Sequence, residues 1–487
     1  LAFYIIEYAL RKPAQAKFCL SSLSNNSRPS EKMTVSKPIP FQSPGSAHNL
    51  AGHLADVWPP QIGAGCAIEI GLSGGLDSVV LLHVLAGLRP RFGFVLRAVH
   101  VHHGLNAAAD EWAAFCADLC RSLDVPLRVE NVHIEAGGLG VEAAARRERY
   151  AAFVRGGANV LALAHHQDDQ VETFMLAALR GGGLRALAAM PMWRPLDAHT
   201  QIWRPLLGYT REQLADYAEA NALAYVEDSS NADTALLRNW LRQQALPAWR
   251  QRLPQLDRHL LSSVALLQEE QALLNEVVAA DWAEIHQGGD FDLASWRQLS
   301  ALRRRQQLLQ FARLHSLGTP RYVAVADFER VLEKIQTASA EWRLPHGRAL
   351  AYRNRLFAFQ DDWQQDCAWL KPECPLSGRL NNILTNNGFT LRTHSFGLSE
   401  EVLAQFGTVR PAATDEVINL TVGRKSVRKI LQECGVLPFM RPYWPIVTDG
   451  ENRCVAIANV WVNVHYGVAG GKLPVCEKIN RFILEPK

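Results

Sequence analysis

Residues 71–78 read Gly-Leu-Ser-Gly-Gly-Leu-Asp-Ser, and this stretch decides the fold. It follows an apolar run at 66–70 that predicts a buried strand, and it precedes an apolar run at 79–85 that predicts a helix. A strand that turns directly into a helix points several backbone N–H groups at one place, where the helix dipole favours an anion. Glycine suits such a turn because the backbone takes unusual angles and a ligand must approach it closely. We therefore expect an anion-binding loop, with a plain glycine turn as the alternative.

The loop lacks the features of the ordinary nucleoside-triphosphate loop. No Gly-Lys-Ser/Thr follows the glycines, and no lysine lies between Lys37 and Lys334. The pattern resembles the loop of the pyrophosphate-loop ATPases, which cleave ATP between the α and β phosphates. The resemblance implies ATP and Mg²⁺ as cofactors, with Asp77 as the metal ligand, and it leaves the acceptor open. The residues expected to bind the nucleotide are Ser73, Gly74, Gly75, Leu76, Asp77 and Ser78.

The composition is that of a globular chain with two to four domains. Of the 487 residues, 48% are hydrophobic and 20% are charged, and no apolar run approaches the length of a membrane span. The net charge of +3 is compatible with a nucleic acid partner but does not require one. Nine cysteines without C-x-x-C pairs indicate a reducing compartment, so we expect a cytoplasmic protein without a membrane partner. Cys116 and Cys120 lie one helical turn apart and are expected to be buried.

Residues 1–45 are expected to form a disordered or non-native extension. They begin with Leu1 and become rich in serine and asparagine at 21–27. A translated upstream stretch with Met33 as the start is favoured over a targeting peptide, because Glu7 and Glu31 interrupt the segment and no regular amphipathic helix emerges.

From residue 66 onward, short apolar runs alternate with helical segments. The expected strands are 66–72, 95–101, 127–132 and 159–164, and the expected helices are 78–89, 110–124, 139–155 and 168–180. This alternation predicts an α/β fold with a doubly wound parallel sheet, in which ligands bind beyond the carboxyl ends of the strands. Chemically active residues follow three of the expected strands, so we expect one site at that edge.

The pattern changes further along the chain. Long amphipathic helices at 256–286 and 294–315, and a shorter one at 323–337, predict a helical middle domain that ends in strands between 343 and 359. The last part predicts a small mixed α/β domain with one clear helix at 424–434. The expected domains are a nucleotide-binding domain at 46–245, a helical domain at 246–370 and a C-terminal domain at 371–487.

Two motifs near the strand ends carry charged side chains in helical spacing. His165-His166-Gln167-Asp168-Asp169 opens a helix on which Asp169 and Glu172 are neighbours. Two carboxylates together can bind Mg²⁺ or the ammonium group of an amine substrate, while a zinc site or an acidic helix cap are the alternatives. Arg146, Arg149 and Tyr150 share one face of another helix, where guanidinium groups suit phosphate recognition, although a solvated basic face is also possible.

Together these motifs closely resemble the tRNA(Ile)-lysidine synthetase family of pyrophosphate-loop ATPases. The resemblance covers roughly residues 66–250, and the middle helices and the segment from Gly423 to Pro445 are similar to that family's later domains. The motifs that carry it are Ser73–Ser78, Val101–Leu105, Ala145–Tyr150, His165–Thr173, Leu179–Leu184, Trp203–Leu207 and Glu227–Thr234, with Arg238, Asn239 and Arg242. One departure is Ser229, where the family often has proline, which changes the stiffness of that loop.

The resemblance implies a ligase reaction with roles for particular residues. ATP adenylates the C2 oxygen of the wobble cytidine in the CAU anticodon of an isoleucine tRNA, and the ε-amine of free L-lysine then displaces AMP. Asp169 and Glu172 would contact lysine. The residues expected to act in catalysis are Asp77, Arg146, Asp169, Glu172, Arg238 and Arg242, the three arginines on phosphate and the activated cytidine. His100 and His102 join the loop residues as nucleotide ligands, and a homodimer is possible.

Two basic segments favour RNA contact independently of the resemblance. Arg424, Lys425, Arg428 and Lys429 occupy i, i+4 positions on the expected C-terminal helix, and Arg303, Arg304 and Arg305 mark a second basic spot. Solvated basic faces are the alternative for both.

Three other classes of protein share part of the pattern. A tRNA thiolation enzyme would need reactive cysteine pairs near the motifs, and a glutamine-dependent amidating ligase would need a nucleophilic cysteine. A non-catalytic RNA-binding module does not account for carboxylates and glycines gathered at the strand ends.

Overall fold

The computed structural model describes residues 49–104, 108–133, 141–227, 233–286, 290–335, 339–361, 378–379, 389–405 and 408–484. The extension expected at 1–45 lies outside these residues, as do Leu105 and the loop residues 228–232. The chain divides into two compact units, the first ending at Leu274 and the second beginning at Asn275. The division falls within one helix, α11 (Leu256–Ile285).

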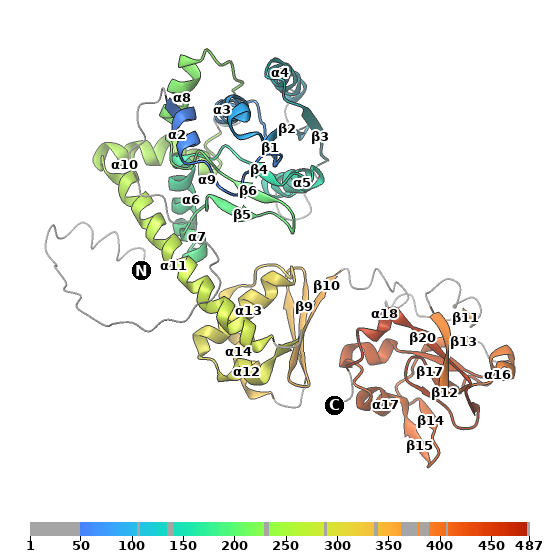
Figure 1. Ribbon diagram of the computed structural model, residues 1–487. Helices are drawn as coiled ribbons and strands as arrows, with labels where there is room; N and C mark the ends of the chain where they lie inside the picture. The colour runs from blue at the N-terminus through green and yellow to red at the C-terminus, as the bar shows by residue number, and fades with distance from the viewer. Residues whose placement is uncertain are drawn as a thin grey trace, which may run out of the picture. The chain divides into compact units, whose positions relative to one another are not determined.

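A six-stranded sheet organises the first unit (Figure 1), with the strand order β3-β2-β1-β4-β6-β5. Its strands are β1 (Ala67–Gly71), β2 (Val95–His102), β3 (Leu127–Asn131), β4 (Val160–Ala162), β5 (Trp193–Pro195) and β6 (Gln201–Trp203). All neighbours are parallel except β5, which is an antiparallel edge strand beside β6. Strand β1 lies between β2 and β4, which is the point where the winding of the chain reverses and where such sheets bind ligands.

Helices cover both faces of this sheet, which confirms the expected α/β fold. They are α2 (Leu50–Asp56), α3 (Leu76–Phe92), α4 (Ala109–Ser122), α5 (Val141–Arg155), α6 (Gln167–Leu179), α7 (Leu184–Leu187), α8 (Arg211–Ala220), α9 (Leu237–Trp240), the π-helix η3 (Leu241–Ala245), α10 (Leu246–Arg252) and α11. The four strands and four helices expected between 66 and 180 all form, with ends shifted by at most a few residues.

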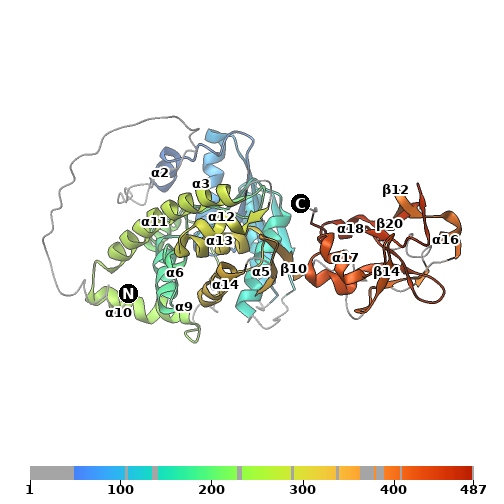
Figure 2. The same ribbon diagram turned by 90° about the horizontal axis from the view of Figure 1, so that it is seen from below.

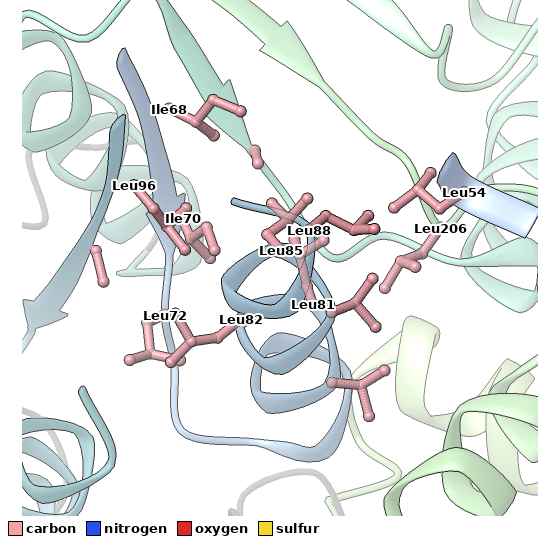
Figure 3. Packing of buried hydrophobic residues seen from close by; sticks show 14 of the residues in the cluster. Leu54, Ile68, Ile70, Leu72, Leu81, Leu82, Leu85, Leu88, Leu96 and Leu206 are labelled. Atoms are coloured by element: carbon pink, nitrogen blue, oxygen red, sulfur yellow. The ribbon is translucent and has the colours of Figure 1, made fainter. Parts of the chain in front are cut away.

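The core under α3 shows why this region folds as expected. Ile68 and Ile70 point to one face of β1 and meet Leu81, Leu85 and Leu88 of α3 (Figure 3). Each fully buried side chain of this kind stabilises the fold by about 1.5–3 kcal/mol. On the opposite face a smaller core forms around Phe153 of α5, where Val99, Leu161, Leu163 and Ile202 pack. Two well-filled faces hold β1 fixed, so the loop that follows it is built on a rigid support.

The second unit combines a helical part with several small sheets (yellow to red in Figures 1 and 2). Its helices are α12 (Leu293–Gln298), α13 (Ala301–Leu314), α14 (Tyr322–Lys334), α16 (Glu400–Gln405), α17 (Val427–Glu433), the 3₁₀-helix η6 (Pro438–Tyr443) and α18 (Glu477–Asn480). Its strands are β7 (Phe291–Asp292), β8 (Ala340–Leu344), β9 (Gly347–Tyr352), β10 (Arg355–Gln360), β11 (Gly378–Arg379), β12 (Phe389–Leu398), β13 (Thr408–Pro411), β14 (Val417–Asn419), β15 (Arg424–Ser426), β16 (Pro445–Thr448), β17 (Cys454–Ile457), β18 (Trp461–Val462), β19 (Gly467–Ala469) and β20 (Lys472–Cys476).

Two expected helices of this unit are corrected. The segment 294–315 is two helices, because Leu299 has extended backbone angles and Ser300 begins α13 as its N-cap. The helix expected at 424–434 begins only at Val427, because residues 424–426 form β15 and pair with β14. Among the described residues, no helix combines the length and apolar character needed to cross a membrane.

Candidate active site

The loop after β1 is held in shape by its own serines. The Ser78 hydroxyl accepts a hydrogen bond from the Ser73 backbone N–H at 3.2 Å and donates one to the Gly75 carbonyl at 2.9 Å. The Gly75 N–H in turn donates to the Ser73 hydroxyl at 3.3 Å. Gly74 has φ +87°, and a Cβ there would lie 3.0 Å from Val226 and 3.2 Å from the sulfur of Cys116. Glycine is therefore required at this position both for its backbone angle and for space.

This loop opens directly into α3, a helix of 17 residues whose N-cap is Gly75. The unpaired N–H groups of its first turn and its dipole make the loop suitable for the phosphates of a nucleotide. Asp77 lies in that first turn, and one of its carboxylate oxygens, Oδ1, is buried without a hydrogen-bond partner. Burial raises the pKa of Asp77, and Asp169 adds to this effect, while the cations His166, Arg211 and Arg242 oppose it. A half-buried carboxylate whose buried oxygen has no partner is suited to a divalent cation.

Asp169 and Glu172 lie together on α6, as their spacing predicts, and both are buried. Each is paired with two arginines that follow in the sequence. Arg238 donates to Glu172 at 2.9 Å and to Asp169 at 3.1 Å, and Arg242 donates to Glu172 at 2.5 Å and to Asp169 at 3.3 Å. The two carboxylates are therefore paired with arginines within the fold, and the role expected for Arg238 and Arg242 on phosphate stays a prediction.

The arginines owe their position to an irregular stretch of helix. Arg238 lies on α9 and Arg242 on the π-helix η3, directly before α10. Pro247 stands at the start of α10 and has no N–H to offer a carbonyl of the preceding turn, which accounts for the widened turn before it. Of the motif at residues 227–234, the structure describes Glu227, Asp233 and Thr234, and the Asp233 carbonyl accepts a hydrogen bond from the side chain of Asn239 at 2.9 Å.

Asp169 both caps α6 and forms part of the charged cluster. Its Oδ2 accepts the backbone N–H of His166 at 3.1 Å, while its Oδ1 accepts from the two arginines. Burial alone would raise the pKa of Asp169, but His166, His165, Arg238 and this hydrogen bond together lower it. The cap and the cluster are therefore not exclusive alternatives, since one carboxylate serves both.

His166 connects this cluster to the loop. Its Nε2 lies 3.6 Å from Asp77 Oδ2 and 3.6 Å from Asp169 Oδ2, and its Nδ1 lies 3.6 Å from Asp168. Burial by itself would lower the pKa of His166, but the three carboxylates outweigh it and the pKa is raised. The loop and α6 are thus brought to one place by contacts between β1 and β4, the two strands at the reversal point.

The other residues expected at the site lie around this centre. His100 is buried and its Nδ1 lies 2.9 Å from the Leu72 carbonyl, so the ring supports the end of β1. His102 pairs with Asp110 at 3.0 Å. Arg146 donates to the Tyr150 hydroxyl at 3.3 Å, while the expected third member of that face, Arg149, contacts His103.

Asp168 has a position that the sequence motif did not reveal. Its carboxylate accepts the backbone N–H of Arg211 at 3.0 Å and a hydrogen bond from Arg250 at 3.0 Å, which ties α6 to α8 and α10. Burial would raise its pKa, but the hydrogen bonds and the charges of His166 and Arg250 lower it far more. The Asp-Asp doublet in the sequence was the available signal, and only the fold separates the two roles.

Two alternatives at the site find no support. Among the side chains that the structure describes, no three of His, Cys, Asp and Glu gather as a zinc site would require. Cys116 and Cys120 are buried as expected, and burial raises their pKa values to about 12 and about 11. Neither thiol has the low pKa of a reactive cysteine.

The basic segments of the second unit are largely engaged within the fold. Arg303 pairs with Asp281, Arg304 with Glu329 and Glu333, and Arg305 with Glu329. The basic spot expected at 303–305 is therefore neutralised by acidic neighbours.

The basic residues expected on a single helix at 424–429 lie on two elements, because α17 begins only at Val427. Arg424 and Lys425 lie in the hairpin strand β15, where Lys425 pairs with Glu433. Arg428 and Lys429 remain exposed on the first turns of α17.

Comparisons with known proteins agree with this arrangement. The PP-loop domain family matches residues 53–249, and the TilS substrate C-terminal domain family matches residues 408–473. The tRNA(Ile)-lysidine synthase of Neisseria meningitidis serogroup B is 46% identical over 422 residues, covering 87% of this chain and 98% of that protein. The Chromobacterium violaceum protein of the same name is 40% identical, covering 88% and 99%, and that of Pseudomonas aeruginosa is 38% identical, covering 80% and 89%.

Near-complete coverage at this identity extends the relationship well beyond the nucleotide loop. The described site also contains the loop, the carboxylate pair and the arginines in one place. The chain belongs to the tRNA(Ile)-lysidine synthase family of PP-loop, ATP-using ligases.

Proposed function

We propose that this chain joins free L-lysine to C2 of the wobble cytidine in the CAU anticodon of an isoleucine tRNA, with cleavage of ATP to AMP and pyrophosphate. One observation carries the proposal. In a member of this family, a rigid phosphate loop at the end of β1 lies beside two buried carboxylates that can take an ammonium group. The loop would serve the activating half of the reaction, and the carboxylates would bind the lysine whose amine attacks the activated cytidine.

The first step would activate the base. The C2 oxygen of the cytidine attacks the α phosphorus of ATP, the bond between the α phosphorus and the bridging oxygen breaks, and pyrophosphate leaves. Gly74 and Gly75, with Ser73 and Ser78, would hold the pyrophosphate, and the Gly75 N–H and the Ser78 hydroxyl would exchange their present hydrogen bonds within the loop for it. Arg146 would contact phosphate or the activated cytidine, as the resemblance implies.

The residues at the loop also fit a magnesium ion. The partnerless Oδ1 of Asp77 would hold the ion, since Mg²⁺ in nucleotide sites takes few protein ligands. When bound, the ion would neutralise charge on the triphosphate. A carboxylate must be ionised to hold the ion, and burial, which raises the pKa of Asp77, opposes this while His166, Arg211 and Arg242 favour it.

The second step would replace AMP by lysine. The ε-amine attacks C2, the bond from C2 to the adenylated oxygen breaks, AMP leaves, and the proton lost by the amine passes to solvent water. Asp169 and Glu172 would bind lysine by taking over charge that Arg238 and Arg242 now neutralise. The lowered pKa of Asp169 suits it to binding an ammonium group and makes it a weak proton acceptor.

Pyrophosphate release provides the test. The reaction contains ATP and an unmodified CAU isoleucine tRNA transcript. We expect the amount of AMP formed to rise when lysine is added and not to rise when cysteine is added in its place. AMP formation that responds to cysteine or to a sulfur donor, and not to lysine, would contradict the proposal in favour of thiolation. The buried, high-pKa thiols near the loop already disfavour that reading. The homodimer and the cytoplasmic location expected from the sequence stay predictions.

A further inference from the structure

Three arginines surround one tyrosine on the α5 side of the sheet. Arg146 and Arg194 place their guanidinium carbons 5.1 and 5.6 Å from the centre of the Tyr150 ring. Arg194 comes from the edge strand β5, and Arg204 follows β6. Arg204 is only 3% exposed and donates to the Pro191 carbonyl at 2.8 Å. Residues from one helix and two strands thus converge on Tyr150.

These cations lack anionic partners within the described fold. Among the side chains that the structure describes, no carboxylate pairs with Arg146, Arg194 or Arg204. The Nε of Arg204 is buried and makes no hydrogen bond, and the same holds for Nδ1 of His165, three residues after the end of β4. Burial lowers the pKa of Arg204, and the charges of Arg194 and Arg146 lower it further, against the opposing effect of Tyr150.

The cluster also adjoins the carboxylate pair. Burial lowers the pKa of His165 to about 4, and the charges of Arg204, Arg238 and Arg146 act in the same direction, while Asp169 opposes them. His165 is therefore within electrostatic reach of both the arginine cluster and the site expected for lysine. Like charges held together without partners cost free energy, and such an arrangement is typical of a site that takes an anion.

We propose that Arg194 and Arg204 complete, with Arg146 and Tyr150, a binding site for a phosphate group of a substrate. Guanidinium groups present planar, forked donors that match phosphate oxygens, and the exposed Arg194 leaves the site open to solvent. The inference rests on the proposed function, which brings two sources of phosphate to this edge of the sheet. One is the RNA backbone beside the target nucleotide, and the other is ATP.

The test compares Arg194→Gln with Arg155→Gln in the full chain. Arg155 is a matched control because it lies on α5, is half exposed, and pairs with Glu130 instead of the cluster. The dissociation constants of ATP and of the unmodified CAU isoleucine tRNA transcript are measured at several NaCl concentrations. We expect Arg194→Gln to weaken one or both about tenfold, while Arg155→Gln stays at the wild-type value.

The two measurements distinguish the sources of the phosphate. Weaker RNA binding, with a salt slope reduced by about 0.7–0.9, identifies the RNA backbone, whereas weaker ATP binding identifies the nucleotide. Wild-type affinity for both would overturn the proposal, and so would an effect confined to the concentration of lysine needed for half-maximal rate.

A second variant guards against a change in folding. Tyr150→Phe keeps the ring but removes the hydroxyl that accepts from Arg146, and we expect about a threefold loss for the same ligand with an unchanged unfolding temperature. Failure of the proposed function is distinguishable, because there the wild-type chain itself would form no lysine-dependent AMP. If the wild-type chain is active and Arg194→Gln equals Arg155→Gln, only the phosphate site is wrong.

Discussion

At the scale of single residues, the site holds groups in states that cost the fold free energy. Asp77 is half-buried near Asp169, its buried Oδ1 has no hydrogen-bond partner, and its raised pKa reports this cost. A folded chain gains nothing from such a carboxylate unless a ligand uses it. Asp168, one residue from Asp169, shows the opposite, because its depressed pKa reports net stabilisation by its partners. An aspartate-to-asparagine substitution at Asp77 should therefore affect turnover, whereas the same substitution at Asp168 should affect the stability of the fold.

Asp77→Asn should abolish turnover without loss of stability. The variant removes the proposed cation ligand, so AMP formation should fall by about 100-fold or more. Since the pKa of Asp77 is raised, its charge destabilises the fold near neutral pH, and the neutral amide should leave the unfolding temperature unchanged or higher. Pyrophosphate release and thermal unfolding measure the two effects. Normal turnover in this variant would remove Asp77 from the mechanism.

Asp168→Asn should lower the free energy of unfolding by about 1–3 kcal/mol at about pH 6, because it breaks the hydrogen bonds to Arg211 and Arg250. A carboxylate whose folded pKa is depressed stabilises the fold fully above its ordinary pKa of about 4. The stabilisation is lost as the pH falls through the folded pKa, so the difference between wild type and variant should shrink below about pH 4. Chemical denaturation across this range is the measurement.

Asp118→Asn is the matched control for that experiment. Asp118 forms an exposed pair with Arg121, so its loss should change the free energy of unfolding by less than about 0.5 kcal/mol at every pH. A deficit in Asp168→Asn that grows on acidification would show that the carboxylate does not stabilise the fold as described.

At the scale of elements, local patterns were reliable where one segment determines its own structure. Helix α3 was predictable because a continuous apolar run follows the loop, and the same holds for the other elements between β1 and α6. The helix expected at 424–434 failed at its start because β15 depends on pairing with β14, a contact that spacing within the segment does not show. The break between α12 and α13 had a local signal in Ser300, a residue type favoured at helix N-caps.

The contacts of the site also differ in whether local sequence could predict them. The pairing of Asp169 with Glu172 follows from helical spacing and was predictable. Their partners Arg238 and Arg242 lie about 70 positions later, so the ion pairs depend on the whole fold. The sequence pointed to all four of these residues, but it placed the two arginines on phosphate and gave no sign that they pair with Asp169 and Glu172.

The shortened α17 gives a specific prediction for RNA binding. Replacing both Arg428 and Lys429 by alanine should weaken tRNA binding and reduce the salt slope by about 1.5, the amount expected for two lost phosphate contacts. ATP binding should not change. Lys425→Ala is the control, because Lys425 is already paired with Glu433 and should have a smaller effect. Filter binding at several salt concentrations measures the tRNA affinity of the wild type, the double variant and Lys425→Ala. Equal losses of affinity in the two variants would contradict the structure of the hairpin.

At the scale of the whole molecule, point substitutions test the tail better than truncation. The division expected at 370 stays a prediction, and the C-terminal core includes Leu350 and Tyr352 from β9. Removing residues 371–487 would expose those side chains, so a loss of tRNA binding in the truncated chain would not distinguish a missing contact from a damaged fold.

One chemical outcome separates lysine transfer from every other reaction that a PP-loop site could support. Nucleosides from a CAU isoleucine tRNA transcript, incubated with the chain, ATP and isotopically labelled lysine, can be analysed by mass spectrometry. We predict that the label appears in a single modified cytidine at the wobble position and only in the presence of ATP. Consumption of ATP with no labelled nucleoside, or with sulfur in the base instead, would contradict the central claim.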